Sequence, residues 1–174
     1  MLRFISEDNY AMHVEYLNAL KVKLSALTKI APELDHPKVL SAKRCTRDRE
    51  LLNGMRLVGE IRLHEAYLES FGEREFQRSA VADRVFGSSA ELLGRLYRLA
   101  LDIPYGFVGV TVDKKGRIGE FSLTDYAQLD LNGTTVLAVD VCEHAYFMDY
   151  GFNKERYLKR ALAYLSFERL DVFS

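Results

Sequence analysis

The sequence predicts an α+β protein, with a helical N-terminal half followed by a three-stranded antiparallel sheet flanked by helices. Two observations lead to this prediction. Before residue 102, apolar residues recur at three- and four-residue steps, which is typical of amphipathic helices. From Tyr105 onward, β-forming residues gather in short runs that turn residues separate.

Two long helices are expected to form a hairpin that makes up the first region, residues 1–72. Apolar side chains mark one face of each helix, and the connection between them contains two prolines. The expected ranges are 7–28 for the first helix, 31–41 for the connection and 46–70 for the second helix.

The second region, residues 73–174, is expected to hold the sheet and the remaining helices, and to form one compact unit with the first. Ser88 and Glu91 have the spacing of a capping box, in which a serine oxygen accepts a bond from a free N–H at the start of a helix. The expected helices cover residues 74–85, 88–101 and 154–169, and the expected strands cover residues 107–112, 117–123 and 134–139.

The composition is that of an ordinary globular protein. Hydrophobic residues make up 48% of the chain and charged residues 28%, enough for both a core and a solvated surface. The formal net charge is -1, which argues against nucleic acid or an anionic membrane as a partner. We expect a cytoplasmic protein, because no apolar signal core or membrane-spanning run is present.

The most specific stretch of the sequence is Asp-Val-Cys-Glu-His-Ala-Tyr at residues 140–146. Asp140 ends a predicted strand, and His144 follows four residues later, so one helical turn would point both side chains at the same ion. A carboxylate and an imidazole suit iron, manganese or zinc. An isolated pattern of this kind is more often a helix-capping aspartate beside a buried, hydrogen-bonded histidine.

The surroundings change this interpretation, because the stretch closely resembles the D-x-W-E-H-A-Y signature of iron/manganese superoxide dismutases. Leu63 to Leu68 is similar to that family's N-H-x-x-F/Y-W segment, and His13 to Asn18 is similar to its H-x-x-Y-V-x-N segment. The similarity covers nearly the whole chain in the right order. The chain is therefore identified as a divergent, shortened member of this family.

The resemblance implies one iron or manganese ion per chain, with zinc as a further possibility. It makes His64, Asp140 and His144 ligands of that ion, and it makes Tyr16 the active-site tyrosine. Glu143 would reach the ligand histidine of a partner subunit, which implies a homodimer.

The fourth ligand departs from the family pattern. In the register set by Tyr16, the family's first ligand histidine falls on Asp8, and positions 8, 12 and 16 share one helical face. His13 lies about 140° around the helix from Asp8, and its register matches a family histidine that is not a ligand. The expected ligand set is therefore Asp8, His64, Asp140 and His144, unless Asp8 is an ordinary exposed residue at a helix N-terminus.

The side chains around the ligands also differ from the family pattern. Glu60 stands where iron-type members carry a glutamine that hydrogen-bonds the metal-bound solvent. It could hold that solvent, bind the metal or be an exposed helix residue. Gln128 could instead match the glutamine of manganese-type members. Met12 and Phe147 replace a gateway histidine and its partner tyrosine.

These differences lead us to expect a weak superoxide dismutase. A carboxylate in place of an imidazole ligand adds negative charge beside the ion, which stabilises the oxidised metal and lowers its potential. Two alternatives stay open: a protein of this fold that binds a metal for another purpose, or one that has lost the metal and serves a structural or interaction role. The substrate is expected to be superoxide or another small molecule.

Overall fold

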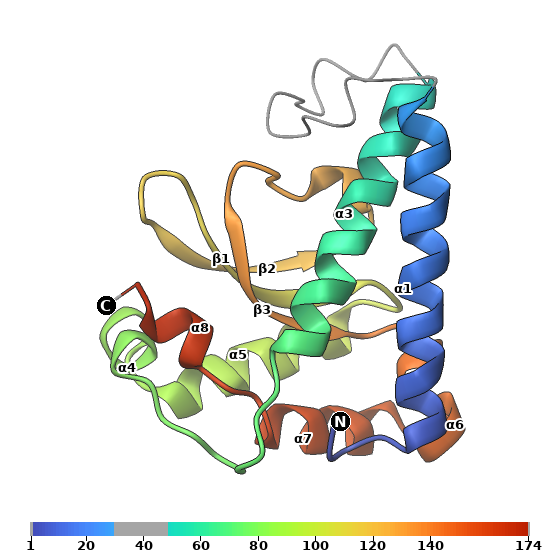
Figure 1. The fold of residues 1–174 in the computed structure, drawn as a ribbon. Coiled ribbons are helices and arrows are strands. Elements are labelled where there is room, and N and C mark those ends of the chain that lie inside the picture. The colour runs from blue at the N-terminus through green and yellow to red at the C-terminus, as the bar shows by residue number, and fades with distance from the viewer. Residues whose placement is uncertain (1, 30–48, 174) are drawn as a thin grey trace.

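The computed structural model describes residues 2–29 and 49–173, and these residues have the expected α+β architecture (Figure 1). Two short 3-10 turns, η3 (Tyr126–Gln128) and η4 (Glu143–Ala145), lie on either side of the last strand. The other elements are α1 (Glu7–Thr28), α3 (Arg49–Glu69), α4 (Ala80–Phe86), α5 (Ser89–Asp102), β1 (Phe107–Val112), β2 (Ile118–Leu123), β3 (Thr134–Asp140), α6 (Phe147–Tyr150), α7 (Lys154–Ala163) and α8 (Glu168–Asp171).

The two long helices α1 and α3 lie side by side along one edge of the molecule (Figure 1). The side chain of Ser6 caps α1 by accepting a hydrogen bond from the backbone N–H of Asn9. Further along, the two helices bury a small apolar cluster of Leu17, Leu20, Leu57 and Ile61. None of the described helices has both the length and the apolar character needed to cross a membrane. The predicted connection over residues 31–41 and the predicted start of the second helix lie outside the described residues.

The sheet has the strand order β2-β1-β3, and both pairings are antiparallel. The central strand β1 is almost entirely buried, and β3 packs against α3. In the register between β1 and β3, Asp140 lies opposite Phe107. The last residue of β3 is therefore placed at the end of the sheet, beside the two long helices.

The structure corrects the ranges of two predicted helices. The helix expected over residues 74–85 begins only at Ala80, where the Ser79 side chain caps it by accepting from the backbone N–H of Ala82. The helix expected over residues 154–169 ends at Ala163. The chain leaves α7 there because two backbone hydrogen bonds join it to the segment after α3. The N–H of Ser166 donates to the carbonyl oxygen of Ser70, and the N–H of Gly72 donates to the carbonyl oxygen of Tyr164.

Two glycines inside helices provide a matched test of how α3 packs against the turn η3. A Cβ at Gly59 would lie 2.2 Å from the carbonyl oxygen of Tyr126, whereas a Cβ at Gly94 on α5 would meet only the end of the Arg98 side chain, at 3.5 Å. We expect Gly59→Ala to destabilise the fold by about 2 kcal/mol through overpacking. Gly94→Ala should stabilise it by about 1 kcal/mol, because glycine is costly in a helix interior.

Urea unfolding followed by circular dichroism measures both changes in the free energy of unfolding. A Gly59→Ala protein as stable as the Gly94→Ala protein would contradict the close approach of α3 to η3.

Candidate metal centre

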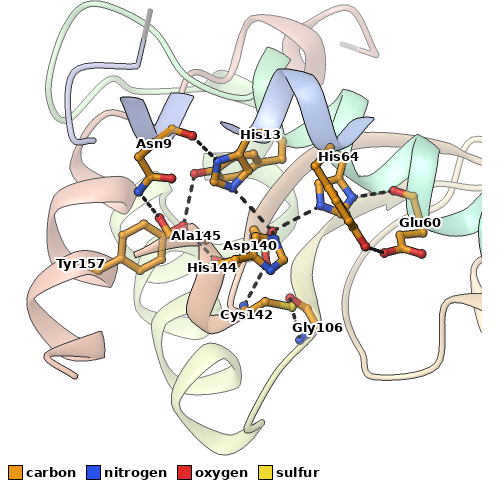
Figure 2. A network of polar contacts seen from close by, with 12 residues as sticks. Asn9, His13, Glu60, His64, Gly106, Asp140, Cys142, His144, Ala145 and Tyr157 are labelled. Carbon is orange, nitrogen blue, oxygen red and sulfur yellow. Dashed lines mark hydrogen bonds and ion pairs between the residues drawn. The ribbon is translucent and has the colours of Figure 1, made fainter. Parts of the chain in front are cut away.

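Four side chains from separate segments converge where β3 ends (Figure 2). Asp140 lies at the centre, with its Oδ2 atom 2.9 Å from Nε2 of His144, 3.6 Å from Nε2 of His64 and 3.9 Å from Nε2 of His13. Asp140, His13 and His64 are buried, whereas the His144 side chain is 38% exposed. The cluster therefore lies inside the fold and opens to solvent on the His144 side.

Local helix geometry fixes the orientation of the two buried histidines. Nδ1 of His13 lies 2.8 Å from the main-chain oxygen of Asn9, and Nδ1 of His64 lies 2.9 Å from that of Glu60, in each case four residues earlier. A carbonyl oxygen only accepts hydrogen bonds, so Nδ1 carries the proton in both rings. In the neutral ring Nε2 then has a free lone pair, which is the form that binds metal ions.

The geometry of His13, Asp140 and His144 fits one metal ion, and His64 lies next to this group. Ligand nitrogen and oxygen atoms lie about 2 Å from an ion such as zinc, which places two ligand atoms roughly 3 to 4 Å apart, as found around Asp140. The ligand atoms of His13, Asp140 and His144 all lie within 4.8 Å of one another, and His64 faces the same carboxylate oxygen. Nε2 of His13 and Nε2 of His64 are buried without a hydrogen-bond partner among the described residues. A cation would satisfy both atoms, and imidazole and carboxylate ligands suit iron, manganese or zinc.

The buried carboxylate of Asp140 is held from several sides. Its Oδ1 accepts a hydrogen bond of 2.8 Å from the backbone N–H of Cys142, and its main-chain oxygen accepts one of 2.8 Å from the Tyr157 hydroxyl. Burial alone would raise the pKa of Asp140, but the hydrogen bond and charge of His144 and the backbone hydrogen bond from Cys142 hold that pKa below its usual value. Asp140 is therefore a buried anion, and a cation can bind beside it.

The electrostatic environments of His13 and His144 differ in a way that follows from their positions. Burial lowers the pKa of His13, which keeps that ring neutral. Burial also acts to lower the pKa of His144, but the hydrogen bond and charge of Asp140, together with the charge of Glu60, raise it overall. The negative charge of Glu60, which is not part of the cluster, thus favours the protonated form of His144.

Tyr16 and Glu60 lie together beside the cluster. The Tyr16 hydroxyl donates a hydrogen bond of 2.6 Å to Oε1 of Glu60. The Tyr16 ring centre is 5.2 Å from that of His64 and 5.7 Å from that of His144. Burial and the bond to Glu60 both raise the pKa of the Tyr16 phenol, so it stays protonated at neutral pH and acts as a donor.

Asn9 supports the cluster in a way that the sequence analysis missed. Besides holding His13 through its main chain, buried Asn9 donates from Nδ2 to the main-chain oxygen of Ala145, at 3.1 Å, and to Oδ2 of Asp149, at 2.8 Å. Ala145 follows His144 directly. Asn9 therefore joins the segment that carries His13 to the segment that carries His144.

The structure brings His13 to the cluster and leaves Asp8, the expected fourth ligand, outside it, so His13 is the candidate for that place. Asp8 is exposed in the first turn of α1, and the buried face of this helix runs through Asn9, His13, Leu17 and Leu20. Tyr16 lies at the edge of that face and is 38% exposed. Counting back from Tyr16 in steps of four residues therefore leads to the solvent side of the helix. The spacing from His13 to Leu17 and Leu20 was the signal that could have identified His13.

The remaining predicted residues lie outside the cluster. Glu143 and Gln128 are both exposed. Met12 is half-buried, and Phe147 is exposed. Of the predicted outer residues, Tyr16 and Glu60 are thus the pair that the described contacts connect to the cluster.

Comparisons with known proteins relate the chain to iron/manganese superoxide dismutases. Residues 74–172 match the family model of the C-terminal domain of iron/manganese superoxide dismutases, a segment that includes Asp140 and His144. The chain is also similar to the protein named superoxide dismutase [Fe] of Cupriavidus metallidurans. The two are 29% identical over an alignment of 174 positions, which covers 94% of this chain and 81% of that protein.

The positions of His13 and Asp8 lead to opposite expectations for two substitutions. His13→Ala removes a buried nitrogen that faces Asp140, so we expect at least a tenfold loss of affinity for iron or manganese. Asp8→Asn changes an exposed residue and should leave that affinity unchanged. Metal titration of the two purified variants and the unaltered protein measures the difference. A loss of affinity in Asp8→Asn alone would restore the assignment made from the sequence.

Proposed function

Because the chain belongs to the iron/manganese superoxide dismutase family, we propose that its buried cluster binds one iron or manganese ion and that the protein converts superoxide to oxygen and hydrogen peroxide. His13, His64, Asp140 and His144 would hold the ion. The observation that carries the proposal is the pair of buried Nε2 atoms, in His13 and His64, that lack a hydrogen-bond partner and face one buried carboxylate oxygen.

The chemistry needs an electron acceptor and donor at one place. When bound, an ion with two accessible oxidation states supplies both, so that one superoxide is oxidised to oxygen and a second, with two protons, is reduced to hydrogen peroxide. The protein has to supply a dry site, a fixed ligand geometry and protons. Asp140 contributes a buried negative charge that offsets part of the charge of the ion.

Tyr16 is the described residue best placed to move a proton at this site. Its hydroxyl oxygen carries a proton that it donates to Glu60, and its side chain is partly exposed, so it exchanges protons with water. Its ring lies beside those of His64 and His144. We therefore assign to Tyr16 the catalytic role of holding a proton at its hydroxyl oxygen, close to the reacting atoms.

The reason for expecting weak activity changes with the fourth ligand. A carboxylate at Asp8 would have lowered the potential of the ion, but the cluster contains three imidazoles and a single carboxylate when His13 takes that place. Met12 and Phe147 still cannot transfer protons. We therefore propose a working dismutase whose rate depends on proton supply more than on its ligands.

Metal analysis and a superoxide assay test this proposal together. Protein purified without added metal should contain close to one iron or manganese ion per chain and should consume superoxide. His64→Ala should lose both the metal and the activity. Tyr16→Phe should keep the metal and lose about tenfold or more in rate, because it removes a side chain that holds a proton at the site.

Three results would contradict the proposal in different ways. Zinc in place of a redox metal would favour another use of the site. A chain without metal that resists loading would favour a structural or interaction role. Full metal content without superoxide consumption would separate metal binding from dismutation.

We also propose that the protein forms a homodimer through the surface around η4 and α6. Glu143 and part of His144 are exposed there, so both could reach a second copy. Beside them lie the exposed apolar side chains of Phe147, Met148 and Phe152, and the rings of Phe147 and Phe152 stack edge to face at 5.1 Å. An apolar surface with charged groups at its border is typical of interfaces between subunits.

A charge placed in this surface should separate the subunits. Phe152 is 85% exposed, so Phe152→Asp should fold normally and yet sediment as a monomer, while the unaltered protein sediments as a dimer. Val22→Asp is the matched control, because Val22 is 71% exposed in the later part of α1, beyond the residues that contact η4 and α6, and should leave the dimer intact. An unaltered protein that is monomeric at micromolar concentration would refute the dimer, and so would a dimeric Phe152→Asp protein.

A further inference from the structure

Glu60 connects the candidate metal centre to its solvent-facing side. Its main-chain oxygen accepts the Nδ1–H bond of His64, and its Oε1 accepts the hydroxyl bond of Tyr16. The first bond belongs to helix α3 and the second crosses to α1. The carboxylate is therefore held next to Tyr16, whose ring centre lies 5.2 Å from that of His64 and 5.7 Å from that of His144.

The role of Glu60 in these contacts is that of an anion. An ionised carboxylate accepts hydrogen bonds and donates none, and the Tyr16 phenol is the donor in the bond between them. Glu60 is half-buried, so its charge is only partly screened by water. Its hydrogen-bond partner Tyr16 has its ring centre 5.7 Å from that of His144, the partly exposed member of the cluster.

Negative charge at this place has a consequence for the molecules that enter. Asp140 already contributes a buried anion at the centre. A second negative charge beside the cluster repels small anions, whereas neutral molecules of the same size are not repelled. An uncharged amide at the same position could still accept the Tyr16 hydrogen bond without that repulsion.

We propose that Glu60 determines the substrate specificity of the site, by reducing its affinity for small anions. This inference rests on the proposed function, because it concerns anions that approach a metal-loaded centre. Superoxide is such an anion, so the same residue limits how well the protein uses it. Glu60 acts here through its charge, in addition to orienting His64 and Tyr16.

Azide titration of the iron-loaded protein tests the inference through binding, without measuring turnover. We expect Glu60→Gln to bind azide about tenfold more tightly than the unaltered protein, as read from the absorption change of the iron centre. Damage to a site weakens binding, so a gain in affinity identifies the removed charge as its cause. Glu65→Gln is the matched control on the same helix. Glu65 pairs with Lys21 at 2.7 Å on the surface, and its substitution should leave azide affinity unchanged.

Tyr16→Phe distinguishes the effect of the Glu60 charge from the effect of its hydrogen bond to Tyr16. It keeps the Glu60 carboxylate and removes the hydroxyl that binds it, so it should not tighten azide binding. Equal azide affinity in Glu60→Gln and the unaltered protein would overturn the inference, and so would an equal gain in Tyr16→Phe and Glu60→Gln. Iron content is measured for every variant. Failure of the unaltered protein to bind iron would refute the proposed function as well, whereas loaded proteins with equal azide affinities would refute this inference alone.

Discussion

The site depends on a carboxylate that the fold buries completely. Asp140 ends β3 in the core, where an isolated anion would be strongly unfavourable. The structure compensates for it with the backbone N–H of Cys142 and the imidazole of His144. Two more imidazole nitrogens, in His13 and His64, face the same carboxylate without a partner of their own. Buried polar groups left in this state indicate a cation site, because an ion satisfies the carboxylate and both nitrogens at once.

One local rule positions the histidines of both long helices. In α1 and in α3 the ring nitrogen Nδ1 donates to the carbonyl four residues earlier, which turns Nε2 toward the sheet. The residue that supplies this carbonyl also reaches across to another segment through its side chain. Asn9 reaches Ala145 and Asp149, and Glu60 reaches Tyr16. The residue that orients each helical histidine therefore also joins its own helix to a second segment of the fold.

The fold and part of the site could be predicted because their signals are local. Strand and turn residues lie next to each other in the sequence, and the segment from Asp140 to His144 carries its own pattern. The place of His13 in the cluster depends on the rotational register of α1, which Tyr16, at the edge of the buried face, does not define. The end of α7 also escaped prediction, because residues 164–166 leave the helix to bond with residues 70–72, which are far away in the sequence.

With His13 proposed as the fourth ligand, the unusual features of this protein lie around the ligands and not among them. With Asp8 outside the cluster, the groups that face an ion are three imidazoles and one carboxylate, so the ligand set gives no reason for a lowered potential. What stays different is the solvent-facing side, where Glu60 holds Tyr16 and where Met12 and Phe147 have no proton to transfer. Ligands decide whether an ion binds, whereas these outer side chains decide which molecules and protons reach it. Divergence at these outer positions can therefore change the substrate preference of the protein and preserve its metal.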